Sequence, residues 1–283
     1  MRVLKIILCV FLSLFFVTTL FINVSPQFGS NPSRSQRQFF SSFKNFANGE
    51  FKNNEPTALF TDEMSFRDFF KTELNRVPIK EIIPLKVDVE SFVEDNIEQV
   101  KMVWLGHSAF LININGSVIL LDPMLGSHAA PVPLPSLKRY SSKIAFDINE
   151  LEVIDFVVFS HDHYDHLDYP TIKKIKSRVK NFIVPHGIGN HLKGWGVQNE
   201  LITELNWNES FSYNDIEFVC LPARHFSGRG PLNRNSTLWS SWAIKSNVGK
   251  IYFSGDSGYG AHFKNIGKEH GPFDFSLIDC GQY

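Results

Sequence analysis

The stretch from residue 161 to residue 168 concentrates side chains that bind metal ions. It reads His-Asp-His-Tyr-Asp-His-Leu-Asp, so three imidazoles and three carboxylates lie within eight residues. Imidazole and carboxylate together suit zinc, iron or manganese. Such a run directly after an apolar segment is costly to pack without a purpose. We therefore interpret it as a metal site rather than as a polar loop with solvated histidines.

The spacing within this run favours two ions over one. His161 and His163, two residues apart, can direct their imidazoles to one ion. Asp165 and His166 are placed to serve a second ion a short distance away. A single ion that took four ligands from six consecutive residues would be badly strained. The sequence thus predicts a binuclear centre.

Two more residues of ligand type follow the ends of later predicted strands. His225 comes shortly after the strand predicted for residues 216–221, and Asp256 shortly after the one predicted for residues 250–254. Taken alone, the first would be a surface histidine and the second a turn aspartate. Beside the cluster at residues 161–166, we expect both to reach the metal site.

The elements around the first cluster place it at the end of a sheet. Residues 156–160 form an apolar run that predicts a buried strand, and a helix is predicted over residues 169–180. Asp168 is its expected cap and Pro170 lies in its first turn. The cluster therefore lies on a strand-to-helix loop, where active sites of α/β folds gather.

The rest of the pattern predicts a layered α/β architecture. Strands that first form hairpins and later alternate with helices are typical of such folds. Asn115-Gly116 predicts a tight hairpin turn, and a helix is expected over residues 62–76. The other predicted strands cover residues 102–105, 109–112, 117–121, 182–184, 241–244 and 275–278.

The N-terminus reads as a signal peptide or a membrane anchor over residues 1–24. Arg2 and Lys5 precede residues 6–22, which carry no charge. We favour an uncleaved anchor because no Ala-x-Ala cleavage pattern follows, and the flanking charges then place the domain on the extracytoplasmic side. Cleavage would instead give a secreted or periplasmic protein. Residues 25–60 are expected to be a linker that wraps the domain surface.

Composition excludes some other classes of protein. The net charge of −1 gives no basic field for nucleic acid. None of the three cysteines forms a Cys-x-x-Cys pair, which argues against a cysteine zinc site. Residues 255–258, Gly-Asp-Ser-Gly, are too short for a phosphate-binding loop.

The order of these motifs resembles the metallo-β-lactamase superfamily, and most closely its branch with the N-acyl-phosphatidylethanolamine-hydrolysing phospholipase D. The similarity covers roughly residues 51–283. It is carried by Trp104-Leu105-Gly106-His107, Leu121-Asp122-Pro123, residues 160–168, residues 225–229, residues 238–242, residues 252–259 and Gly271-Pro272-Phe273-Asp274. The resemblance implies an αββα sandwich and a hydrolase domain over residues 61–283.

The resemblance also implies roles for the site residues. His161, His163 and His225 would bind one zinc ion, Asp165 and His166 the other, and Asp256 would bridge both. A hydroxide between the ions would be the nucleophile, and Asp165 would orient that water or pass on its proton. Iron or manganese could replace zinc.

The chain departs from the family pattern at its C-terminal end. Family members carry a further histidine there that completes the second metal site, and His262 and His270 are the only histidines after Asp256. Both lie in a region expected to be a loop, and neither is expected to be a ligand. We therefore expect a domain that is incomplete at its C-terminus, without its last strands and helices.

Several residues keep two interpretations. His107 either forms a hydrogen bond near the metals or is an ordinary buried histidine, and Asp122 is a supporting or turn carboxylate. Trp239 and Trp242, with Arg224 and Arg229, either line a substrate groove that holds a phosphate or, for the tryptophans, pack in the core. No firmer assignment follows from the sequence.

Three functions remain open. The first is a metal-dependent phosphodiesterase that acts on phospholipid-like substrates beside the membrane reached by residues 6–24. The second is a lactonase or another ester hydrolase, because the same nucleophile attacks carbonyl groups. The third is a truncated chain that binds metal without turnover.

Overall fold

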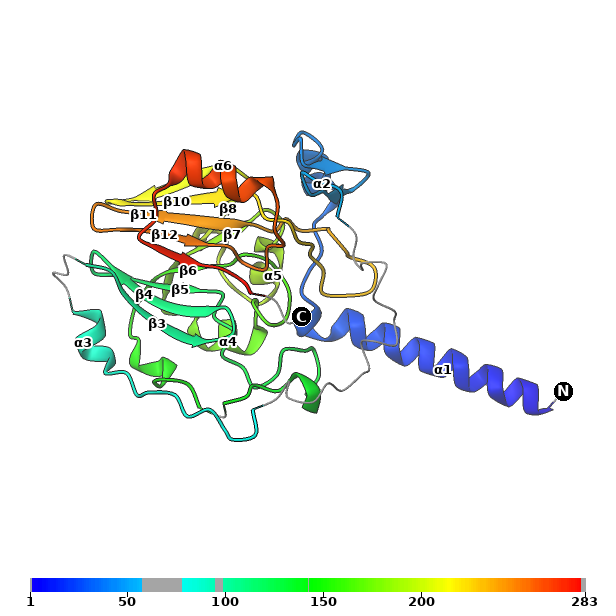
Figure 1. The fold of residues 1–283 in the computed structure, drawn as a ribbon. Helices are drawn as coiled ribbons and strands as arrows, with labels where there is room; N and C mark the ends of the chain where they lie inside the picture. Colours follow the sequence, from blue (N-terminus) through cyan, green and yellow to red (C-terminus); the bar gives the residue numbers. More distant parts are fainter. Residues whose placement is uncertain (1, 58–77, 95–98, 142, 281–283) are drawn as a thin grey trace.

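The computed structural model describes residues 2–57, 78–94, 99–141 and 143–280. Two β-sheets face each other and helices cover their outer faces, which is the predicted αββα sandwich (Figure 1). The helix predicted over residues 62–76 lies outside the described residues.

The first sheet has six strands in the order β3-β4-β5-β6-β7-β8. Their bounds are β3 Lys101–Gly106, β4 Ala109–Ile114, β5 Ser117–Leu121, β6 Ile154–Val158, β7 Val179–Pro185 and β8 Ile202–Leu205. The strands β3, β4 and β5 pair antiparallel, whereas β5 to β8 pair parallel. Asn115 and Gly116 join β4 to β5 with positive φ angles, as a two-residue hairpin turn requires.

The second sheet has five strands in the order β13-β12-β11-β10-β9. Their bounds are β9 Ser210–Tyr213, β10 Ile216–Leu221, β11 Ser241–Lys245, β12 Lys250–Phe253 and β13 Phe275–Leu277. Only β12 and β13 pair parallel; the other neighbours are antiparallel. The strands predicted at residues 216–221, 241–244 and 250–254 are confirmed within one residue at their ends.

The core lies between the two sheets and on their outer faces. Side chains from both sheets meet in one buried cluster that includes Ile112, Val158, Phe218, Trp242 and Ile251. The outer face of the first sheet packs against α3 (Val89–Val93), α4 (Tyr169–Ile175) and α5 (Gly189–Gly194). The outer face of the second sheet packs against Ile266 of α6 (Ala261–His270).

Some expected element boundaries were wrong. The helix predicted for residues 169–180 ends at Ile175, because the chain from Val179 joins the sheet as β7. His262 and His270 lie on α6 rather than in a loop. The strands β8 and β9 were not predicted, since their exposed and half-exposed residues give no apolar run.

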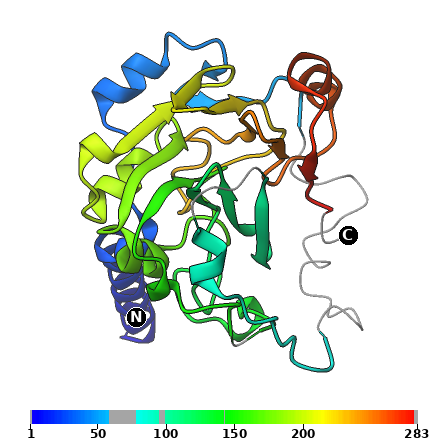
Figure 2. The same cartoon turned by 90° about the vertical axis from the view of Figure 1, so that its left-hand side faces the viewer.

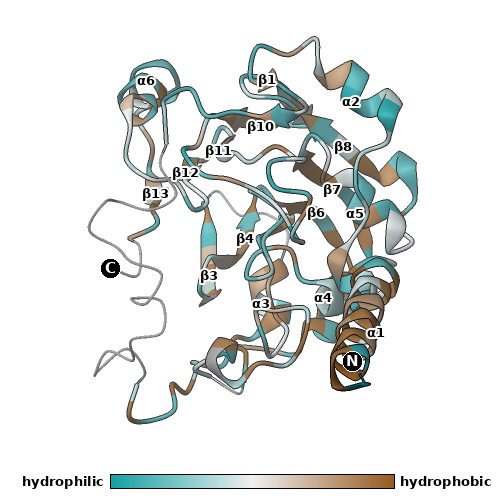
Figure 3. Cartoon of the chain, turned by 90° about the vertical axis from the view of Figure 1, so that its right-hand side faces the viewer, coloured by the Kyte–Doolittle hydropathy of each residue, from teal (hydrophilic) through white to brown (hydrophobic). Residues whose placement is uncertain are grey.

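The N-terminal helix α1 (Arg2–Val24) has no buried residue. It projects from the domain (Figure 1), and its residues are mostly hydrophobic (Figure 3). Its 23 residues are long and apolar enough to cross a membrane, a property that signal sequences share. It ends at Val24, directly before η1 (Pro26–Phe28), where the chain meets the domain.

The predicted linker lies against the domain over its described part, residues 25–57 (Figure 2). It contains α2 (Arg34–Phe40), capped by Ser33, and a hairpin of β1 (Phe46–Ala47) and β2 (Glu50–Phe51). Phe40, Phe46 and Phe51 are buried in the same cluster as Trp239 and Trp242. The boundary between linker and hydrolase domain stays a prediction.

Candidate metal centre

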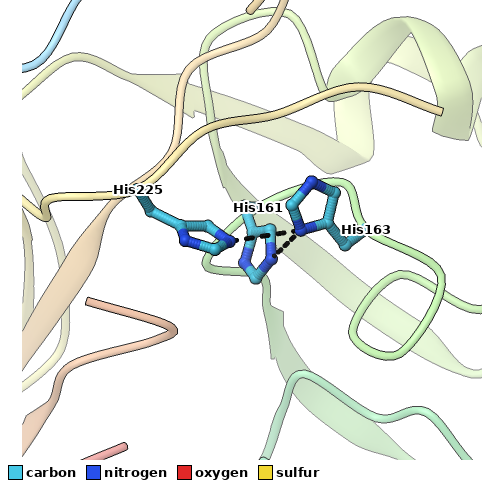
Figure 4. A group of neighbouring side chains, drawn as sticks. All are labelled: His161, His163 and His225. Carbon is cyan, nitrogen blue, oxygen red and sulfur yellow. Dashed lines mark hydrogen bonds between the residues drawn. The ribbon is translucent and has the colours of Figure 1, made fainter. Parts of the chain in front are cut away.

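The loop that joins β6 to α4 carries the first candidate ligands, as the sequence predicts. His161 and His163 lie on it, and His225 lies on the loop that follows β10 of the other sheet. The three rings point toward one another (Figure 4). Strand ends of both sheets thus meet at one side of the sandwich.

These three imidazoles form the first donor cluster. Nδ1 of His163 lies 2.9 Å from Nε2 of His161 and 3.2 Å from Nε2 of His225. One nitrogen from each ring lies within 4.8 Å of the others. Three imidazole nitrogens at this spacing fit a zinc-type ion with an open position.

A second donor cluster lies beside the first and contains His107, Asp165, His166 and Asp256. Nε2 of His166 lies 3.1 Å from Oδ1 of Asp256, and Nε2 of His107 lies 3.1 Å from Oδ2 of Asp165. The other oxygen of Asp256, Oδ2, lies 4.0 Å from Nε2 of both His161 and His225. Asp256 therefore turns one oxygen toward each cluster.

One buried atom tests whether these residues fit an ion. His166 is fully buried, and its Nε2 makes no hydrogen bond, although Oδ1 of Asp256 lies 3.1 Å away. Buried polar atoms in native proteins almost always have a partner, so such an atom calls for a ligand. The surrounding donors are imidazole and carboxylate groups, which suit a divalent ion.

Asp122 supports His166 from behind. Its Oδ1 accepts a hydrogen bond from the Ser160 backbone N–H at 2.7 Å, and its Oδ2 lies 2.7 Å from Nδ1 of His166. The Ser160 hydroxyl also donates to Oδ2. A carboxylate on Nδ1 fixes the tautomer, so that Nε2 keeps a free lone pair. Of the two roles that the sequence left open for Asp122, the structure shows the supporting one.

The charges of the site favour a bound cation. Burial lowers the pKa of His161 well below its ordinary value, and it lowers that of His225 to about 3. Burial also lowers the pKa of His166, but Asp256, Asp165 and Asp122 outweigh it and raise that pKa well above its ordinary value. The carboxylates therefore call for positive charge at His166, whereas the rings of His161 and His225 stay neutral, as metal ligands must be.

The two candidate acids stay ionised at neutral pH. Burial would raise the pKa of Asp165, but His166 and His107 outweigh it and lower that pKa below its ordinary value. The same opposition, dominated by His166 on the lowering side, lowers the pKa of Asp256. Both side chains are thus carboxylates, the form that binds a metal ion or accepts a proton.

The groove interpretation of the tryptophans and arginines does not hold for most of them. Trp239 and Trp242 are buried in the core, where Trp242 donates from Nε1 to the Phe159 carbonyl at 3.0 Å. Arg229 is 2% exposed and its guanidinium is bound to backbone carbonyls. Arg224 is more accessible and donates to the Tyr259 carbonyl at 2.9 Å.

His107 is the residue whose place the sequence did not settle. It is exposed, not an ordinary buried histidine, and it lies on the turn between β3 and β4 with φ of 47°. The turn brings the imidazole of His107 next to Asp165, and His107 therefore belongs to the second cluster. Its place between the strands predicted for residues 102–105 and 109–112 was the available signal. His262 instead lies 2.8 Å from the Ser257 hydroxyl and joins no candidate cluster among the described residues.

Comparison with known proteins relates the chain to hydrolases. Residues 118–283 match a family model described as a beta-lactamase superfamily domain. An uncharacterized protein of Mycobacterium tuberculosis is 36% identical over 242 residues, which cover 84% of this chain and 64% of that protein. N-acyl-phosphatidylethanolamine-hydrolyzing phospholipase D 1 of Caenorhabditis elegans is 37% identical over 191 residues, covering 64% of this chain and 53% of the relative.

A shorter match is closer in sequence. Outer membrane protein RomA of Klebsiella pneumoniae is 62% identical over 63 residues, which cover 22% of this chain and 47% of that protein. This chain therefore spans less than two thirds of the length of each of these relatives.

Proposed function

We propose that this chain, which belongs to the metallo-β-lactamase superfamily, is a metal-dependent hydrolase with two divalent ions. The observation that carries the proposal is the pair of donor clusters that meet at Asp256. Each cluster offers enough imidazole and carboxylate groups for one ion.

Each ligand has an assigned place in this proposal. His161, His163 and His225 would hold one ion, Asp165 and His166 the other, and Asp256 both. His107 is either a further ligand of the second ion or the hydrogen-bond partner of Asp165. The histidine-rich donor set favours zinc, with iron or manganese as alternatives.

The chemistry is hydrolysis by an activated water molecule. When bound, two divalent ions would lower the pKa of a water molecule and stabilise the charge on the attacking and leaving oxygens. The carboxylate of Asp165 can orient that water and accept its proton at a carboxylate oxygen, because the residue is ionised. Nε2 of His107, 3.1 Å from Oδ2, keeps this carboxylate in place.

A phospholipid-like phosphodiester is the proposed substrate. The name of the C. elegans relative supports this choice, and so does the apolar helix α1, which would hold the domain beside lipid. The anchored domain would lie on the extracytoplasmic side, or in the periplasm or outside the cell if α1 is cleaved. A lactone or other ester is the alternative substrate, because the same attack opens a carbonyl compound.

Metal content and a two-substrate assay test the proposal. We expect about two ions per chain in protein purified without added metal, since each cluster is a separate site. The protein should release headgroup from vesicles of N-acylated phosphatidylethanolamine. Ring opening of lactones without headgroup release would favour the alternative, and two ions without either reaction would favour a binding protein.

A matched pair of variants ties the activity to the site. His163→Ala should lose one ion and nearly all hydrolysis. His128→Ala, in the loop after β5, should keep the metal content and the hydrolysis of the wild type. Full hydrolysis by His163→Ala with unchanged metal content would sink the assignment. Fewer than one ion per wild-type chain would count against two filled clusters.

A further inference from the structure

The chain directly after α1 lies behind the loop that carries the ligands. We call residues 26–30 the juxtamembrane segment and residues 161–168 the ligand loop. The ring of Phe28 contacts Phe21 of α1 at 5.6 Å between centroids, and Tyr164 of the ligand loop at 6.4 Å. Tyr164 stands between the candidate ligands His163 and Asp165. A row of aromatic rings thus connects the helix to the loop.

Arg229 joins the juxtamembrane segment to both ends of the ligand loop. Its Nε and Nη2 donate to the Gln27 carbonyl at 2.9 and 2.7 Å. Its Nη1 donates to the carbonyls of Asp162 at 2.6 Å and Leu167 at 2.8 Å. The guanidinium also lies 4.1 Å from the centre of the Tyr164 ring. One buried cation therefore holds three backbone carbonyls in fixed positions.

His191 makes a second connection on the same side. Its Nδ1 accepts a hydrogen bond from the Ser30 backbone N–H at 2.9 Å, so its proton is on Nε2. Nε2 lies 3.2 Å from Oδ2 of Asp162, which also accepts from the Thr237 hydroxyl at 2.8 Å. His191 and Asp162 are both fully buried. Asp162 lies between His161 and His163, so this chain of bonds ends inside the ligand loop.

We propose that the juxtamembrane segment is a structural part of the metal centre, which it stabilises through Arg229 and His191 as positioning residues. The inference rests on the proposed function, because the proposed function assigns metal ligands to the ligand loop. Without the Gln27 carbonyl, two N–H groups of a buried cation would lose their acceptor. Arg229 would then shift toward other acceptors and release the carbonyls that it holds in the loop.

Two glycines provide a matched pair of variants. Gly29 has φ of 70°, and a Cβ there would lie 2.1 Å from Nδ1 of His191. Gly49 has φ of 82°, but a Cβ there would meet nothing within 4 Å. Gly29→Ala and Gly49→Ala both place an alanine at a positive φ, which L-residues rarely adopt. Only Gly29→Ala adds a clash that displaces the juxtamembrane segment from His191.

The test is hydrogen exchange on the full chain in detergent micelles, first with chelator and then with zinc. We expect Gly29→Ala to speed exchange of residues 161–168 by about tenfold or more, while Gly49→Ala matches the wild type. Exchange in β10 should stay the same in all three, which shows that the sandwich is intact. With zinc, Gly29→Ala should bind about 10–100-fold more weakly, as expected when ligand support is lost.

Arg229→Lys gives an independent measurement if Gly29→Ala fails to fold. It keeps the positive charge but lacks the planar fork, so it should also speed exchange in the ligand loop. Faster exchange confined to residues 26–36, with the ligand loop and zinc affinity unchanged, would overturn the inference. A wild-type chain that binds neither zinc, iron nor manganese would contradict the proposed function instead, and the exchange measured with chelator would still decide this inference.

Discussion

Nδ1 of His166 lies 2.7 Å from Oδ2 of Asp122, and both side chains are fully buried. Asp122 has a positive φ of 37° and receives two hydrogen bonds from Ser160, at the start of the ligand loop. The carboxylate thus fixes both a candidate ligand and the backbone beside it. This makes Asp122 a target for a test that leaves every proposed ligand in place.

Asp122→Asn should weaken binding of the second ion by about 10–100-fold, because the ligand that it orients loses a charged acceptor. Competition with a chelator of known affinity measures the change. Asp215→Asn, in the exposed turn between β9 and β10, is the control and should bind as the wild type does. Equal affinities for the two variants would remove Asp122 from the metal centre.

His107→Asn tests the fourth member of the second cluster. Asparagine tolerates the left-handed backbone at this position, so the imidazole is removed with little added strain. We expect the metal content to fall from about two ions toward about one at limiting zinc, since only the second cluster loses a donor. His128→Asn should keep both ions. Two ions retained in His107→Asn would show that His107 is dispensable.

His186 should make the stability of the domain sensitive to acid. Its ring lies 5.0 Å from that of Phe43, and burial lowers its pKa although Glu204 and Glu209 oppose the shift. The imidazole of His186 therefore binds a proton at a higher pH in the unfolded chain than in the folded chain. The stabilisation is therefore complete above a pH of about 6.5 and is lost as the pH falls below it.

Urea unfolding at pH 7.5 and at pH 5.5 checks this sign. Between pH 7.5 and pH 5.5 the free energy of unfolding should fall more for the wild type than for His186→Gln. The difference between the two falls should be up to about 1 kcal/mol. The glutamine cannot take up a proton, so it reports the contribution of all other groups. A larger loss in His186→Gln would contradict the direction of the shift.

Deletion of residues 2–24 should release the protein from membranes without unfolding the domain. No residue of α1 is buried, whereas residues 26–30 make the contacts with Arg229 and His191. Flotation of vesicles with the deleted and the intact chain measures the difference. A deleted chain that still floats with the vesicles would show that another surface binds lipid.

The ligand loop stands out in the sequence because four candidate ligands, from His161 to His166, lie within six residues. Buried apolar runs such as β6 and β10 also stand out, since both faces of these strands are covered. The edge-side strands β8 and β9 do not, because their side chains are mostly half-exposed or exposed. The local pattern therefore located the buried strands and two of the four edge strands of the sandwich, β3 and β13, but missed β8 and β9.

The residues that hold the ligands in place, Asp122 and Arg229, could not be identified from the sequence in the same way. Asp122 lies 44 residues before His166, and Arg229 lies 202 residues after Gln27. The first contact depends on the pairing of β5 with β6 within one sheet, and the second on how the N-terminal segment packs against the domain; hydrophobic periodicity encodes neither. The sequence therefore allowed a groove for Arg229, although its guanidinium is enclosed by backbone carbonyls.

The buried rings of Phe40, Phe46 and Phe51 have a consequence for synthesis of the chain. Their partners in the core include Trp239 and Trp242, which leave the ribosome almost two hundred residues later. Until then these three rings lack their tryptophan partners in the core, and incompletely packed apolar side chains favour aggregation. Packing of the linker is thus complete only after residues 239–242 are made, and a ribosome stalled before residue 239 would present a chain in need of a chaperone.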